Sequence, residues 1–202
     1  MKKTGCFKIF SLTIGSMILM SSITSQTAKS ADSKETLQLE LSTGGSVVIE
    51  LMPDIAPKHV ERIKALATEG FYDNIVLHRV ISGFMAQTGD PTGTGTGGSK
   101  YENLPAEFSN YTYKRGTVGM ARTASPDSAN SQFFICFNDT GCTSLTGQYT
   151  VWGQVTSGME YVDAIALGEP PASPDKIVKM SVGSPTAPAE AAPASGSETP
   201  AH

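Results

Sequence analysis

The sequence predicts a mainly β fold, a closed antiparallel barrel with two α-helices outside it. Three observations lead to this fold class. Short β-rich runs dominate the chain, loops rich in Gly, Ser, Asn and Asp separate those runs, and only two segments show the periodicity of a helix. Strands and helices do not alternate along the chain, which argues against a doubly wound α/β fold.

The strands are predicted where apolar residues occur at every second position, the pattern of a half-buried strand. Leu37, Leu39 and Leu41 alternate with polar residues over residues 36–41. A tight turn at residues 43–45 then leads to a second strand at 47–51, so the first two strands form a hairpin. Six further β-rich runs follow, at residues 75–81, 84–88, 117–121, 133–137, 149–155 and 177–182.

Two segments are predicted to be helical. The first begins at or near Pro57, because the first turn of a helix does not need the N–H that proline lacks. Gly70 ends it, and its apolar residues recur on one face at Val60, Ile63, Leu66 and Ala67. The second is a short helix at about residues 159–166, bounded by Gly158 and Gly168.

The first thirty residues differ from the rest of the chain and predict a secretory signal peptide. A lysine-rich start precedes an uncharged apolar run at residues 9–23, and small residues at 28 and 30 offer a cleavage site. A membrane anchor is the alternative, but the run is short for a bilayer span and Ser and Thr interrupt it. We therefore expect residues 1–30 to be removed, no stable membrane insertion afterwards, and a periplasmic or secreted protein.

The remaining chain divides into a folded domain at residues 31–182 and a tail at residues 183–202. The tail consists almost entirely of Ala, Pro, Ser, Thr, Gly and Glu, and no Leu, Ile, Phe or Val follows Val182. Such a segment cannot bury enough apolar area to offset the entropy lost on ordering. We therefore expect the tail to be disordered.

Charge and motif context exclude several classes of protein. The formal net charge is −4 and no basic stripe is present, which argues against nucleic-acid binding. Residues 93–98 match the dinucleotide-binding pattern G-x-G-x-x-G, but the flanking strand and helix that this motif requires are missing. We expect this run to be a flexible wall beside a ligand groove. The His and Cys residues are widely spaced, so no metal site is predicted.

Cys136 and Cys142 would both remain after removal of the signal peptide, in an oxidising compartment. Cys136 follows three apolar residues in a strand that is expected to be buried, where a small apolar Cys needs no partner. We therefore expect two free thiols, and a disulfide between them is the alternative.

Residues 77–90 combine a strongly apolar strand pattern with two polar side chains, Arg79 and Gln87. An arginine among apolar residues is costly unless something pairs with it. Arg79 therefore points to solvent, pairs structurally with an acid, or serves a site. A second stretch favours a site, because residues 119–122 and 130–135 place another amide and two aromatic side chains on nearby strands.

These two stretches together resemble the cyclophilin family. The family's run H-R-V-I-x-G-F-M-x-Q-x-G-D stands at residues 78–90, and its run S-Q-F-F-I stands at residues 131–135. The resemblance extends over about residues 36–182. It implies a closed eight-stranded antiparallel barrel capped by two α-helices, and a peptidyl-prolyl cis/trans isomerase that needs neither cofactor nor metal.

The resemblance also implies a set of site residues. The catalytic residues would be Arg79, Phe84 and Gln87. The substrate-binding residues would be Met85, Ala121, Arg122, Gln132, Phe134, Leu145 and Tyr149.

Their implied roles differ. Phe84, Met85, Phe134 and Leu145 would form the pocket for the substrate proline ring. Gln87 and Gln132 would hold substrate backbone groups. Ala121 and Arg122 fall where family members contact the residue before the proline, and Tyr149 stands where many eukaryotic members have His.

The expected partners are proline-containing peptides and exported proteins that are unfolded or still folding. No nucleic acid is expected, and we expect a monomer. A non-catalytic module that binds proline peptides in the same groove is the alternative. The presence of Arg79, Phe84, Gln87 and Phe134 together favours the enzyme.

Overall fold

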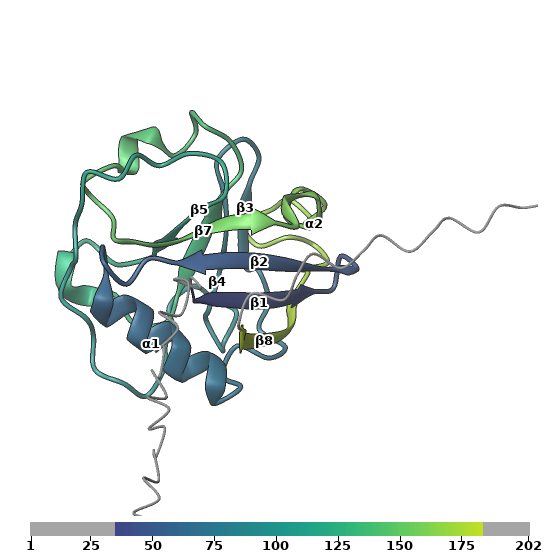
Figure 1. Cartoon of the computed structure of the whole chain (residues 1–202). Coiled ribbons are helices and arrows are strands. Elements are labelled where there is room, and N and C mark those ends of the chain that lie inside the picture. The colour runs from purple at the N-terminus through teal and green to yellow at the C-terminus, as the bar shows by residue number, and fades with distance from the viewer. Residues whose placement is uncertain (1–34, 184–202) are drawn as a thin grey trace, which may run out of the picture. The chain divides into compact units, whose positions relative to one another are not determined.

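The structure is a computed structural model that describes residues 35–183 (Figure 1). The expected signal peptide, and all of the expected tail except Gly183, lie outside the described residues. Within this range none of the helices is long and apolar enough to cross a membrane.

In residues 35–183, eight strands form one antiparallel sheet, as expected for the fold class. In chain order they are β1 (Thr36–Leu41), β2 (Gly45–Leu51), β3 (Arg79–Ile81), β4 (Met85–Thr88), β5 (Thr117–Met120), β6 (Phe133–Cys136), β7 (Val151–Ser157) and β8 (Ile177–Gly183). Their order in the sheet is β3-β4-β6-β5-β7-β2-β1-β8.

The sheet curls into a half-barrel whose two end strands, β3 and β8, do not pair with each other. Within the described residues, an isolated bridge between Val76 and Lys176 joins the segments that precede these two strands. The expectation of a closed barrel is therefore slightly overstated, although the strand count and the antiparallel arrangement are confirmed.

The helices lie outside the sheet, as expected (Figure 1). Helix α1 (Pro57–Thr68) packs against both β7 and β8, which β2 and β1 separate in the sheet, and so covers one opening of the half-barrel. Its buried side chains include all four apolar residues of the predicted helical face. Helix α2 (Met159–Asp163) packs against β2 and is shorter than predicted.

The main core lies inside the curled sheet. Leu37, Leu39 and Leu41 of β1 are all buried, which confirms the two-residue period of the sequence. Phe133 packs edge-on against both Tyr72 and Trp152, with ring centroids 5.5 and 5.4 Å apart. Full burial of an apolar side chain contributes roughly 1.5–3 kcal/mol, so this core supplies most of the driving force for folding.

The start of α1 depends on an acid that is distant in sequence. Within the described residues no side chain of α1 caps its own first turn. Instead the Glu107 carboxylate accepts hydrogen bonds from the backbone N–H groups of Lys58 and His59, at 3.2 and 3.0 Å. It also lies 2.6 Å from His59 Nδ1. A carboxylate is stabilising at this positive end of the helix dipole.

A disulfide joins Cys136, the last residue of β6, to Cys142, so the expectation of two free thiols is wrong. The chain between them turns back because Asn138 Oδ1 accepts hydrogen bonds from the N–H groups of Thr140 and Gly141. This turn brings the two Cys Cα atoms to 6.2 Å, within the usual range for a disulfide. A short 3₁₀-helix, η2 (Thr143–Leu145), follows directly.

We expect loss of this disulfide to destabilise the folded domain. Cys142→Ala should lower the free energy of unfolding by about 2 kcal/mol, because closing a loop of this length restricts the unfolded chain by about that amount. Urea denaturation with and without a thiol reductant measures the effect. The reductant should weaken the wild type and leave the variant unchanged, and a wild type that is indifferent to reductant would contradict the assignment.

Candidate active site

The candidate site is built on a row of residues that face one another across adjacent strands. Arg79 on β3 is the register partner of Gln87 on β4, and Gln87 is the partner of Phe134 on β6. Phe134 in turn faces Gly119 on β5. Directly opposed residues lie on the same face of a sheet, so antiparallel pairing brings this row together.

Gly119 leaves room for the Phe134 ring, because it has no side chain. A Cβ atom at this position would lie 2.6 Å from Phe134 Cζ and 2.1 Å from the Tyr113 hydroxyl. The missing side chain therefore lets the Phe134 ring lie over the β5 backbone. Tyr113 stacks on this ring at a centroid distance of 5.8 Å, and Tyr149 packs edge-on against it at 5.9 Å. These contacts hold Phe134 in one orientation.

Nine of the ten residues predicted for the site line a single hollow of about 130 Å³. They are Arg79, Phe84, Met85, Gln87, Ala121, Arg122, Phe134, Leu145 and Tyr149. The structure thus brings together residues spread over about seventy positions of the chain, while their individual roles stay predictions. Below the hollow, a second core cluster includes Met85, Phe134 and the Cys136–Cys142 disulfide.

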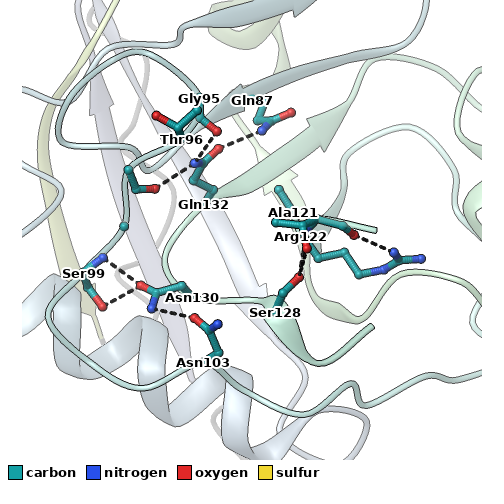
Figure 2. A pocket seen from close by; sticks show the side chains of 13 residues that line it. Gln87, Gly95, Thr96, Ser99, Asn103, Ala121, Arg122, Ser128, Asn130 and Gln132 are labelled. Carbon is teal, nitrogen blue, oxygen red and sulfur yellow. Dashed lines mark hydrogen bonds between the residues drawn. The ribbon is translucent and has the colours of Figure 1, made fainter. Parts of the chain in front are cut away.

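Gln132, the tenth predicted residue, lies in a larger neighbouring cavity of about 480 Å³. Figure 2 shows its amide between Gln87 and the segment of residues 93–98, called the glycine-rich loop below. Gln132 Oε1 accepts a hydrogen bond from Gln87 Nε2 at 2.9 Å, and Gln132 Nε2 donates to the carbonyl groups of Gly95 and Gly97. Gln87, Ala121 and Arg122 line both cavities, so the two lie side by side.

The glycine-rich loop wraps a carboxylate of the protein itself. Asp90 is buried and accepts hydrogen bonds from the backbone N–H groups of Thr92, Thr94, Gly95 and Gly97, at 2.6–3.1 Å. A Cβ atom on Gly97 would lie 2.1 Å from Asp90 Oδ1, so only glycine fits there. The loop does line the larger cavity, as expected, and these hydrogen bonds define its path, while its flexibility stays a prediction.

The same hydrogen bonds determine the charge of Asp90. Burial by itself would raise the pKa of this carboxyl group, but the hydrogen bonds from Thr92, Gly97 and Gly95 outweigh it and hold the pKa well below its usual range. Asp90 is therefore ionised in the folded protein.

Two arginines border the hollow, and they differ in how many of their N–H groups are already hydrogen-bonded within the protein. Arg122 is engaged by the protein, because its guanidinium donates to the carbonyl groups of Gln148 and Thr123 and lies 4.3 Å from the centre of the Tyr149 ring. Arg79 donates from Nε to Glu169 Oε2 at 2.7 Å. Among residues 35–183 this is the one hydrogen-bond partner of the Arg79 side chain, so both of its Nη groups are free to donate.

Glu169 and Asp90 were not singled out from the sequence. Pairing with an acid was one of three possibilities that the sequence left open for Arg79, and nothing in the sequence indicated which acid. The depressed pKa of Asp90 depends on the path of a loop rich in glycine and threonine, which no periodic pattern predicts.

Known proteins are similar to this chain in sequence and in fold. The family model described as cyclophilin type peptidyl-prolyl cis-trans isomerase/CLD matches residues 36–182. A "probable peptidyl-prolyl cis-trans isomerase" of Brucella suis is 51% identical over 173 residues, which cover 78% of this chain and 87% of that protein. Peptidyl-prolyl cis-trans isomerase B of Bacillus subtilis is 42% identical over 130 residues, which cover 64% of this chain and 89% of that protein.

A solved structure agrees with these relatives. A cyclophilin-type peptidyl-prolyl cis-trans isomerase of Cryptosporidium parvum, crystallised in the presence of the dipeptide Ala-Pro, is 28% identical to this chain, with a TM-score of 0.68. The similarity covers 74% of this chain and 99% of that one.

We expect Asp90→Asn to loosen the glycine-rich loop and lower the free energy of unfolding by about 2–3 kcal/mol, because an amide replaces a charged acceptor of several N–H groups. Asp54→Asn, on an exposed loop, is the matched control and should have little effect.

The loss should also depend on pH. Because the pKa of Asp90 is lower in the folded than in the unfolded state, its stabilisation is complete above the usual Asp pKa of about 3.9 and is lost as the pH falls below it. Urea unfolding between pH 2 and pH 6 measures this difference. Parallel pH profiles of wild type and Asp90→Asn would show that Asp90 does not carry the effect.

Proposed function

The chain belongs to the cyclophilin-type peptidyl-prolyl cis-trans isomerase family, and we propose that it accelerates rotation of X–Pro bonds in exported proteins, with Arg79 as the catalytic donor. One observation carries the assignment of the site. Arg79, Gln87 and Phe134 stand opposite one another on three adjacent strands and line one hollow.

The reaction requires rotation without bond breaking. The barrier is ~18–20 kcal/mol because the amide C–N bond has partial double-bond character. Twisting removes this conjugation and restores the lone pair of the proline nitrogen. Catalysis therefore requires a site that binds the twisted state more strongly than either planar isomer. No nucleophile or redox group is needed for such a step.

Arg79 has the properties of a donor to that nitrogen. Its guanidinium is charged at all physiological pH values and carries N–H donors in a rigid planar fork. Glu169 occupies Nε, which leaves the two Nη groups for the substrate. A preorganised donor in a partly desolvated hollow stabilises the twisted state without reorganisation during the reaction.

The apolar part of the hollow would hold the proline ring. Phe134 forms its floor and is fixed by Tyr113 and Tyr149, while Phe84, Met85 and Leu145 complete its lining. The hollow, with a volume of about 130 Å³, has room for one small apolar ring. The crystallisation of the Cryptosporidium parvum relative in the presence of the dipeptide Ala-Pro supports proline-containing peptides as the substrate class.

Gln87 would hold the substrate backbone while the bond rotates. One of its two amide N–H groups donates to Gln132, which leaves the second N–H and the amide oxygen for a peptide. Gln132 donates to the glycine-rich loop and would act mainly by orienting Gln87 and that loop. Ala121 and Arg122 border both cavities, where the residues before the proline would lie.

The sequence before the domain supports export and therefore substrates among exported proteins. Residues 1–30 have the charged start, the apolar run and the cleavage site of a signal peptide. Cell fractionation and the N-terminal mass of the mature protein test this part of the proposal. A full-length cytoplasmic protein would contradict it without affecting the isomerase activity.

We expect Arg79→Ala to lower kcat/KM by about 10²–10³, or ~2.7–4 kcal/mol, which is the usual cost of losing one preorganised donor. A protease-coupled assay on an X–Pro peptide measures this loss, and thermal unfolding should show a folded variant. Lys64→Ala, which removes a different exposed cation paired with an acid, is the matched control.

Two results would contradict the proposal. Activity of Arg79→Ala within twofold of the wild type would exclude Arg79 as the donor. A wild type that binds the peptide without accelerating rotation would instead indicate a non-catalytic binding module.

A further inference from the structure

We propose that Glu169 is a positioning residue that orients the Arg79 guanidinium for the isomerase reaction. This inference rests on the proposed function, because it concerns how the catalytic donor is held. Glu169 does not line the hollow and so acts through Arg79 rather than on the substrate.

The backbone fixes the place of Glu169 independently of its side chain. The preceding residue, Gly168, forms an isolated antiparallel bridge with Val80, the residue after Arg79. Both hydrogen bonds of this bridge are formed, with Val80 N–H donating to Gly168 O at 2.8 Å and Gly168 N–H donating to Val80 O at 2.9 Å. Residue 169 is therefore held next to residue 79 at the edge of the sheet.

The chain can follow this path only with glycine at position 168. A Cβ atom there would lie 2.5 Å from the Cα atom of Pro171 and 2.8 Å from the Pro170 carbonyl oxygen. Gly168 also has a φ of +149°, a conformation that other residues rarely adopt. The local sequence Gly168-Glu169-Pro170 is thus built to present the Glu169 carboxylate beside β3.

The nitrogen atom through which Arg79 binds Glu169 determines which of its N–H groups remain available to a substrate. A contact to a terminal Nη group would use the end of the fork that a substrate needs. Glu169 Oε2 instead accepts from Nε, at 2.7 Å, which fixes the guanidinium plane at its inner edge and leaves both outer groups free. The Arg79 side chain is 41% exposed, so without this contact it would be free to sample other rotamers.

The ion pair itself should contribute little to stability. The two side chains are 41% and 51% exposed, and exposed ion pairs are screened by water and weakly stabilising. The Val80–Gly168 bridge would survive the loss of the carboxylate, because it is made by backbone groups. A positioning role and a structural role therefore predict different results.

The test compares the full chain with Glu169→Ala and Glu169→Gln. We expect Glu169→Ala to lower kcat roughly 5- to 20-fold with KM and melting temperature nearly unchanged, since a misplaced donor weakens only the twisted state. Glu169→Gln, which keeps an oxygen acceptor for Nε, should recover most of the activity. Glu35→Ala is the matched control, because Glu35 forms a similarly exposed ion pair with Lys64 and should leave the activity unchanged.

A double-mutant cycle shows whether Glu169 acts through Arg79. In the Arg79→Ala background, where residual activity is still measurable, Glu169→Ala should have no further effect. The Nε–H resonance of Arg79 in a ¹⁵N NMR spectrum gives a second readout and should shift in Glu169→Ala but not in Glu35→Ala.

The outcomes separate the two proposals. Glu169→Ala with wild-type kcat, or with the same fold loss in the Arg79→Ala background, would overturn the positioning role alone. A parallel drop in melting temperature that accounts for the lost activity would also overturn it and indicate a structural role. Full activity of Arg79→Ala would instead overturn the catalytic role of Arg79, and the positioning role with it.

Discussion

The register between β3, β4 and β6 is the constraint on which the rest of the site depends. It places Arg79 opposite Gln87 and Gln87 opposite Phe134, so that a charged donor, an amide and an aromatic floor share one face. A shift of one residue in either pairing would move every side chain of the shifted strand to the other face. The hollow would then lose its donor or its floor together with the buried residues that flank them.

Polar side chains in loops order segments whose backbone N–H groups have no partner in the sheet. Asp90 gathers the glycine-rich loop, Asn138 closes the turn before Cys142, and Glu107 holds the first turn of α1. In each case the oxygen atoms of one side chain accept from two or more backbone N–H groups that have no partner in a strand or in the body of a helix. Because backbone groups near a core must be satisfied, these contacts order loops that contribute few apolar residues.

Arg79 combines two properties that usually exclude each other. A donor must be held still to favour one geometry, yet it must keep N–H groups unused so that it can donate to a substrate. The guanidinium meets both conditions because its Nε and Nη groups point in different directions. The contact to Glu169 uses the inner group and leaves the outer ones.

Much of the fold follows from the amino-acid sequence alone. The alternation of leucines in β1, the apolar face of α1 and the turn between β1 and β2 arise from local periodicity and local turn chemistry, so they can be read without knowledge of distant neighbours. The ordered motifs at residues 78–90 and 131–135 identify the family and the set of site residues. Nine of those ten residues do line one hollow.

Only the tertiary structure decided the pairing of Cys136 with Cys142, the acid that holds Arg79, the role of Asp90 and the open edge between β3 and β8. Each of these depends on the distance between groups that chain turns bring together. Arg79 and Glu169 are 90 positions apart, and no periodic pattern in the sequence predicts their contact. A single bridge between Val80 and Gly168 determines it. Local patterns determine which face of an element is buried, whereas the path of the loops determines which polar groups meet.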